Sequence, residues 1–254
     1  MSSKRSRPAK KSLTSLYVSL TGAEPGYVPK RWVKFPVALL LLAPCWVLSV
    51  TFFTAMVNTT INDFFWASPV FWFFVGGCAI AGILCEGFPK LVIVYVLGHE
   101  LTHAIWVWLH GGRVHDFRVG WKGGHIITDK TNTWVVLAPY FFPFYTAGWI
   151  VAYGLALLIP SVSAQSESLF FGIGLTWTFH MIYTVRMIKK GQPDIEYGGV
   201  FFSIVVIYFL NLLLISVLLI VASPSVTWTG FACDLLENAM DFSALMVRAV
   251  SRFQ

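Results

Sequence analysis

The stretch LVIVYVLGHELTHAIWVWL, residues 91–109, determines how the rest of the chain is interpreted. It is long and apolar enough for a helix that crosses a membrane, yet it contains two histidines and a glutamate. The chain of 254 residues is 57% hydrophobic and only 12% charged, about half the charged fraction of an ordinary soluble domain. These proportions exclude a disordered chain and predict an integral, multi-pass membrane protein surrounded mainly by the lipid bilayer.

The other apolar runs predict the number of helices. They are Phe35–Val57, Pro69–Cys85, Thr133–Ile159, Leu169–Met187 and Gly199–Val221. With the quoted stretch they predict an all-α polytopic fold of about six transmembrane helices. Only residues 86–90 separate the second run from the quoted stretch, which predicts a tight helical hairpin. Pro139 and Pro143 lie inside the run at 133–159 and should kink or interrupt its helix.

The two ends of the chain differ in character. The basic residues that precede the first run are Lys4, Arg5, Arg7, Lys10, Lys11, Lys30, Arg31 and Lys34. A basic segment beside a span favours a cytosolic N-terminus and contact with lipid rather than nucleic acid. We therefore expect a solvated basic arm (1–34), a transmembrane domain (35–221) and a tail (222–254). The mixed apolar and charged residues of this tail predict an amphipathic helix at the membrane interface.

The basic residues further along the chain conflict with six crossings. With a cytosolic N-terminus, six spans would place the basic residues of segments 113–130 and 186–190 on the far side of the membrane. The positive-inside rule disfavours that arrangement. Either one apolar run does not cross, or the segment 111–132 folds back into the protein.

The residues His99-Glu-Leu-Thr-His103 form the HExxH pattern of zinc hydrolases. On a helix, His99 and His103 project from one face, so the two imidazoles can hold one Zn²⁺. Glu100 lies one position round the helix, where its carboxylate can take a proton from water and pass it to a leaving amine. Burying three such groups in an apolar span is costly, so we predict a metal site with Glu100 as the catalytic residue.

A catalytic zinc site usually has a third protein ligand. The candidates are Asp194, His180 and Glu196. Asp194 is favoured because it lies in a turn interrupted by Pro193 and by glycines, at the start of the last span. His180 lies within a span and is the less favoured ligand; it could instead donate to an oxyanion or be a core histidine. Glu196 is interpreted as a solvated turn residue.

At these residues the chain resembles the site-2 protease-like intramembrane zinc metalloproteases. The likeness covers Leu91 to Asn211 and rests on GHELTHA at 98–104, the proline-bearing next helix, and Pro193-Asp194 followed by glycines at 198 and 199. In that family an Asp near the start of a late helix is the third zinc ligand, and the resemblance carries this role to Asp194. Ile195 replaces the glycine that follows this Asp in the family.

The segment after the HExxH helix predicts a short β-hairpin or a re-entrant loop. Residues 114–119 alternate between apolar and polar, Gly123-Gly124 could turn the chain, and residues 125–128 favour a strand. An exposed strand edge could hold an unwound substrate by main-chain hydrogen bonds. An ordinary surface hairpin is an equal alternative.

Together these features predict a transmembrane catalytic domain that is an intramembrane zinc metalloprotease. Its partner would be a membrane protein or peptide substrate, whose binding residues the sequence does not identify. Two alternatives stay open. One is a membrane zinc hydrolase of a lipid-linked substrate, and the other is a non-catalytic metal-binding scaffold or transporter.

Overall fold

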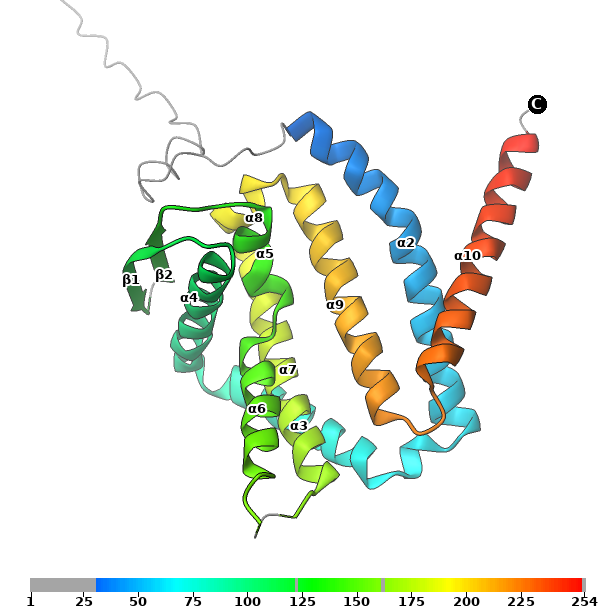
Figure 1. The fold of residues 1–254 in the computed structure, drawn as a ribbon, viewed down its shortest axis with the longest axis horizontal. Coiled ribbons are helices and arrows are strands. Elements are labelled where there is room, and N and C mark those ends of the chain that lie inside the picture. The colour runs from blue at the N-terminus through cyan, green and yellow to red at the C-terminus, as the bar shows by residue number, and fades with distance from the viewer. Residues whose placement is uncertain (1–30, 122, 161–162, 253–254) are drawn as a thin grey trace, which may run out of the picture.

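The computed structural model describes residues 31–121, 123–160 and 163–252, and most of them are helical (Figure 1). Within these described ranges, five helical segments are long and apolar enough to cross a membrane: Val33–Asn62, Pro69–Gly87, Pro89–Leu109, Ser166–Lys190 and Val200–Ala222. They correspond to helices α2 (Arg31–Val57), α3 (Pro69–Gly87), α4 (Val92–Leu109), α7 (Ser166–Lys190) and α9 (Val200–Ala222). A bent pair of helices gives a sixth candidate. This set of apolar helices indicates a multi-pass membrane protein.

The bent pair consists of α5 (Thr133–Phe141) and α6 (Phe144–Ala156), which meet at an angle of 70°. The break lies at Phe142-Pro143, so the predicted interruption at Pro143 is confirmed. Proline has no N–H to continue the helical hydrogen bonding, and its ring restricts the preceding residue. Pro139, in contrast, lies within α5.

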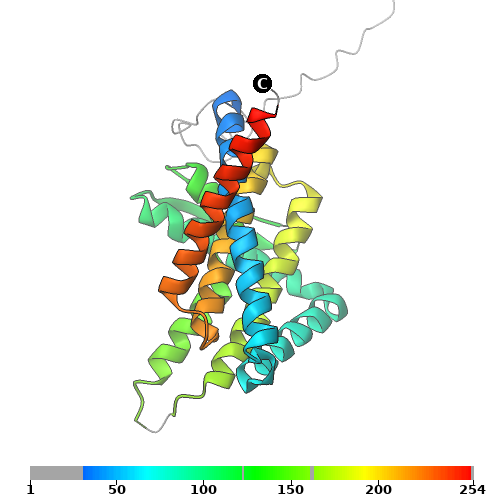
Figure 2. The ribbon, with the colours of Figure 1, turned by 90° about the vertical axis from the view of Figure 1, so that its right-hand side faces the viewer.

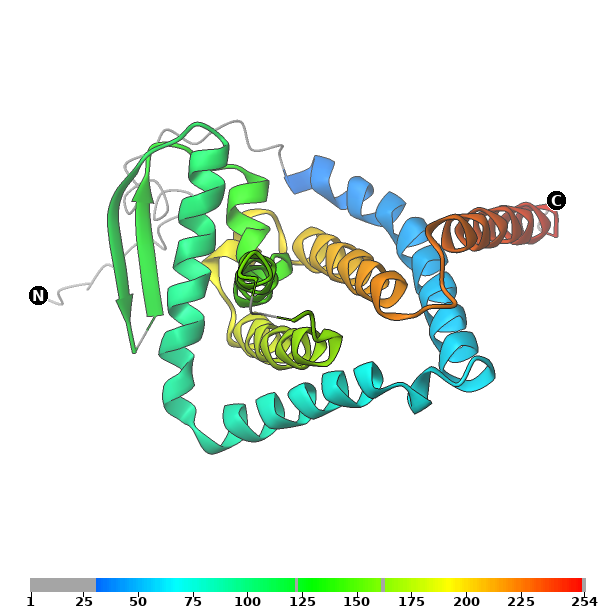
Figure 3. The same ribbon diagram turned by 60° about the horizontal axis from the view of Figure 1, so that its bottom comes forward.

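Helix α3 packs along α7 rather than against α4, so the prediction of a tight helical hairpin is wrong. A Cβ on Gly77 of α3 would lie 2.2 Å from the Phe171 carbonyl oxygen, and one on Gly174 of α7 would lie 2.2 Å from the Phe74 carbonyl oxygen. The two glycines therefore allow the two backbones to touch. The short turn Pro89–Leu91 leads from α3 into α4, and the two helices meet at a corner (Figure 3).

The predicted hairpin is present beside α4. Strands β1 (Val114–Gly120) and β2 (Gly123–Thr128) pair antiparallel, with Phe117 opposite Ile126. Both glycines of the expected turn lie in β2 instead, because β2 begins at Gly123. Strand β2 contacts α4, so the hairpin forms one wall of the region around the HExxH residues.

The start of α2, the β-hairpin and the junction of α7 with the next helix lie toward one end of the molecule (Figure 1). Helix α2 begins there, the hairpin lies there, and α7 leads into α8 (Pro193–Tyr197) there (Figure 1). Helices α3 and α4 together carry the chain back from the far end of α2 to this end. Helices α3 and α4 meet at a corner and do not lie antiparallel, as two opposed crossings in a six-span arrangement would (Figure 3).

Lys34 departs from the prediction of a solvated arm over residues 1–34. It lies in α2 and is only 4% exposed. Its Nζ donates to Thr133 Oγ1 at 3.3 Å and lies over the rings of Tyr197 and Phe202. These contacts compensate for burial of the ammonium and join the beginning of α2 to α5, α8 and α9. Residues 1–30 of the predicted arm lie outside the described residues.

The C-terminal segment forms the predicted amphipathic helix, α10 (Trp228–Ser251), which is not among the helices apolar enough to span a membrane. It runs beside α2 (Figure 2). Phe231 packs on Leu48 and Phe52, and Asn238 Nδ2 donates to Thr51 Oγ1 at 3.0 Å. Its placement at a membrane interface stays a prediction.

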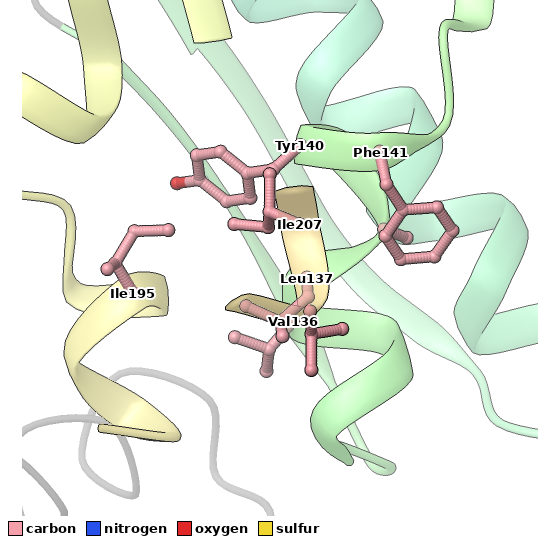
Figure 4. Close-up of a cluster of buried hydrophobic side chains, with 8 residues drawn as sticks. Val136, Leu137, Tyr140, Phe141, Ile195 and Ile207 are labelled. Carbon is pink, nitrogen blue, oxygen red and sulfur yellow. The ribbon is translucent and has the colours of Figure 1, made fainter. Parts of the chain in front are cut away.

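A cluster of buried apolar side chains joins α5, α8 and α9 (Figure 4). Its members are Val136, Leu137, Ala138, Tyr140, Phe141, Ile195, Val206 and Ile207. Burying such side chains stabilises a fold by about 1.5–3 kcal/mol each. The cluster fixes α8 against α5, and α8 carries Asp194.

Candidate metal centre

The structure brings together the two histidines of the HExxH pattern and Asp194. His99 and His103 lie on α4, and Asp194 lies on α8. The Nε2 atoms of His99 and His103 are each 3.4 Å from Asp194 Oδ2. One ligand atom from each of the three side chains lies within 4.8 Å of the other two, so the group could hold a metal ion.

The spacing of these atoms suits zinc. Zinc binds nitrogen and oxygen at about 2.0–2.2 Å, so two ligands of a tetrahedral ion are roughly 3.4 Å apart. The two His–Asp separations of 3.4 Å agree with this value. Two imidazoles and one carboxylate also leave one of four positions open, as catalytic zinc sites do. The residues present therefore fit the ion.

His103 is oriented by a backbone carbonyl that a proline leaves free. In a regular helix the carbonyl of Val135 would accept from the N–H of residue 139, but Pro139 has no N–H. His103 Nδ1 lies 2.8 Å from this Val135 oxygen. Because a carbonyl can only accept, Nδ1 carries a proton, and in the neutral ring Nε2 is then left free to bind a metal. This is the tautomer that a metal ligand requires.

Asp194 is held by a tyrosine that the sequence reasoning did not identify. The hydroxyl of Tyr140 donates to Asp194 Oδ2 at 3.1 Å, and Tyr140 is fully buried. Its ring also packs edge-on against His99, with 5.2 Å between ring centroids. Burial alone would raise the pKa of the Asp194 carboxyl, but the imidazoles of His103 and His99 lower this pKa below its usual range.

Asn211 supports Tyr140 from the neighbouring helix. Helix α5 ends at Phe141, so the Tyr140 carbonyl lacks its helical donor, and Asn211 Nδ2 of α9 donates to it at 2.9 Å. Asn211 thus makes a bond between helices, as its position in an apolar run predicts. The interrupted helix therefore offers two free carbonyls, one to His103 and one to Asn211.

Glu100 is buried and faces the hairpin. It is 5% exposed, and a Cβ on Gly124 would lie 2.6 Å from Glu100 Cγ. A cavity of about 190 Å³ lies here, and its lining includes His99, Glu100, Trp121, Gly124 and Lys190. The carboxylate of Glu100 and the imidazole of His99 thus share one cavity, as a general base and a metal ligand must.

The remaining candidate residues lie outside this group of three. His180 of α7 is buried and lines a separate small cavity with His99. Glu196 lies on α8 on the side of Lys34, where both line another cavity.

Two features of the centre escaped the sequence reasoning for different reasons. Pro139 carried a readable signal, because a proline within a helix always frees the carbonyl four residues earlier. Tyr140 carried no such signal, since a tyrosine in an apolar run is ordinarily a core residue.

No protein-family model, no curated protein and no solved structure matches this chain.

Proposed function

We propose that this protein is an intramembrane zinc metalloprotease, with His99, His103 and Asp194 as zinc ligands and Glu100 as general base and acid. The observation that carries the proposal is the pair of 3.4 Å separations between the histidine Nε2 atoms and Asp194 Oδ2. These donors come from α4 and α8, and α4 lies in an apolar segment of membrane-spanning length. The resemblance to the site-2 protease-like enzymes agrees with this donor set.

Each residue has a distinct task in peptide hydrolysis. Zinc held by the three ligands would supply Lewis-acid chemistry toward water and the substrate carbonyl. The Glu100 carboxylate takes a proton from the attacking water and delivers it to the leaving amine when the C–N bond breaks. Val135 and Tyr140 keep His103 and Asp194 in place through their hydrogen bonds. Water reaches Glu100 from the cavity beside the hairpin.

A peptide is favoured over a lipid-linked substrate because the cavity borders a β-hairpin. Gly124 of β2 lies against Glu100, and strand edges hold extended peptides through main-chain hydrogen bonds. We place the N-terminus and the end that carries the hairpin on the cytosolic side, because α2 begins there, Arg118 belongs to the hairpin, and Lys189 and Lys190 belong to the end of α7.

The test compares Glu100→Gln with the wild type in detergent or lipid nanodiscs. We expect Glu100→Gln to keep its zinc and to lose cleavage of a transmembrane peptide by at least about 100-fold, since general acid–base catalysis contributes about 10²–10⁴-fold. The control is Glu237→Gln, which removes an exposed carboxylate on α10. Zinc-loaded Glu100→Gln with wild-type cleavage would refute the mechanism.

A second comparison tests the ligands. His99→Ala and Asp194→Ala should each lose most of the bound zinc, measured by elemental analysis of purified protein. If the inactive Glu100→Gln variant retains a lipid-linked molecule instead of a peptide, the alternative of a membrane zinc hydrolase with a lipid-linked substrate would be favoured. Zinc bound by the wild type without any hydrolysis would favour a scaffold or transporter.

A further inference from the structure

His180 is a buried histidine that the metal centre does not use as a ligand. It lies on α7 and is 5% exposed. Its Nε2 has no hydrogen-bond partner among the described residues, and neither does Nδ1 of His99. An unpaired polar atom in a protein interior is unfavourable, so two such atoms beside one cavity require a partner.

The two histidines line the same small cavity, together with Tyr95, Thr102 and Tyr145. The space open to a water's centre is about 10 Å³, close to the least that holds one molecule. Other polar groups at this cavity are already engaged, because the Thr102 hydroxyl donates to the Gly98 carbonyl at 2.7 Å and Tyr145 donates to the carbonyl of Val94. His99 Nδ1, His180 Nε2 and the Tyr95 hydroxyl are the polar side-chain atoms of this lining that lack a hydrogen-bond partner among the described residues and remain for a water.

We propose that His180 is a positioning residue for the zinc ligand His99, and that it acts through one water molecule bound between His99 Nδ1 and His180 Nε2. This inference rests on the proposed metal centre.

The protonation states of the two rings are compatible with this bridge. When His99 binds metal through Nε2, its proton is on Nδ1, which then needs an acceptor. The His180 ring also interacts with the Tyr140 backbone carbonyl. Because Nε2 has no partner among the described residues, we assign this contact and the proton to Nδ1, which leaves Nε2 as an acceptor. The water accepts from His99 Nδ1 and donates one hydrogen to His180 Nε2. The Tyr95 hydroxyl of the same cavity, which also lacks a partner among the described residues, is available to its second hydrogen. His103 obtains the same support directly from the Val135 carbonyl.

The experiment measures zinc affinity by competition with a chromogenic chelator in detergent. His180→Leu removes the acceptor, and we expect its zinc affinity to fall about 10–100-fold, as loss of an outer partner of a ligand does. His180→Gln keeps a side-chain oxygen, and we expect it to recover most of that affinity. Thr176→Val serves as the control, because it removes a polar group of the same helix that bonds Thr146 instead.

The thermal stability of the metal-free proteins separates this role from a structural one. His180→Leu should leave the metal-free protein as stable as the wild type while weakening zinc. If His180→Leu keeps the wild-type zinc affinity, or if His180→Gln does not recover it, the role assigned to His180 is wrong. Neither result would contradict the proposed metal centre. If the wild type itself binds no zinc, the assignment and the proposed function both fail.

Discussion

Replacement of Pro139 by alanine should weaken zinc binding without destabilising the protein. Alanine restores an N–H that competes with His103 Nδ1 for the Val135 carbonyl, which now accepts from that nitrogen at 2.8 Å. A hydrogen bond contributes about 1 kcal/mol net, which corresponds to about a fivefold loss of zinc affinity. Proline within a helix costs about 3 kcal/mol relative to alanine, so the metal-free protein should be at least as stable as the wild type.

The assay combines chelator competition for zinc with thermal unfolding of the metal-free protein. Pro44→Ala is the matched control. Pro44 too lies inside a helix, in this case α2, but its side chain is exposed. Affinity of Pro139→Ala within twofold of the wild type would refute the role given to the free carbonyl. Equal losses in Pro139→Ala and Pro44→Ala would show that the effect belongs to helix geometry in general.

Three further substitutions address other contacts of the structure. Tyr140→Phe removes the donor 3.1 Å from Asp194 Oδ2 and keeps the ring, so zinc affinity should fall severalfold in the chelator assay with the fold unchanged; an unchanged affinity would contradict this role. Gly124→Ala places a Cβ 2.6 Å from Glu100 Cγ, so peptide cleavage should fall while zinc content stays at the wild-type level; full cleavage would show that the hairpin does not constrain Glu100. Gly77→Val should separate α3 from α7 and lower the midpoint of thermal unfolding, because even a Cβ at this position would be 2.2 Å from a carbonyl oxygen. Gly76→Val is the control and should leave the midpoint unchanged, because a Cβ there has open space around it.

The parts of the fold that depend on local chemistry could be predicted from the sequence. Runs of apolar residues marked the helices, because length and hydropathy alone select membrane-spanning segments. Pro143 marked the break between α5 and α6 for an equally local reason, the missing N–H. The hairpin followed from alternation, although the position of its turn did not, since Gly124 is needed in β2 to approach Glu100.

The parts that depend on packing between distant segments could not be predicted. Gly77 and Gly174 give no sign in the sequence that they face each other, so the partner of α3 was assigned wrongly. Lys34 was counted as solvated because its aromatic neighbours, Tyr197 and Phe202, are far away in the chain.

At the metal centre, too, local features could be predicted from the sequence and contacts between distant segments could not. The spacing of His99 and His103 places both on one helix face, which any reader of the sequence can derive. The contact of Asp194 with Tyr140 joins α8 to α5 and depends on the whole arrangement of these helices. The resemblance to a known family indicated Asp194, but no local rule indicated its tyrosine.

The place of Asp194 on α8 has a consequence for biosynthesis. The first two proposed ligands are made early, on α4, whereas the third follows only after α7 has been completed. A chain that stops within α7 therefore carries two ligands and lacks the carboxylate that would complete the centre. Stable retention of zinc would then mark a chain whose α5, α7 and α8 have already assembled around α4, so the metal would report on completion of the core as well as serve its chemistry.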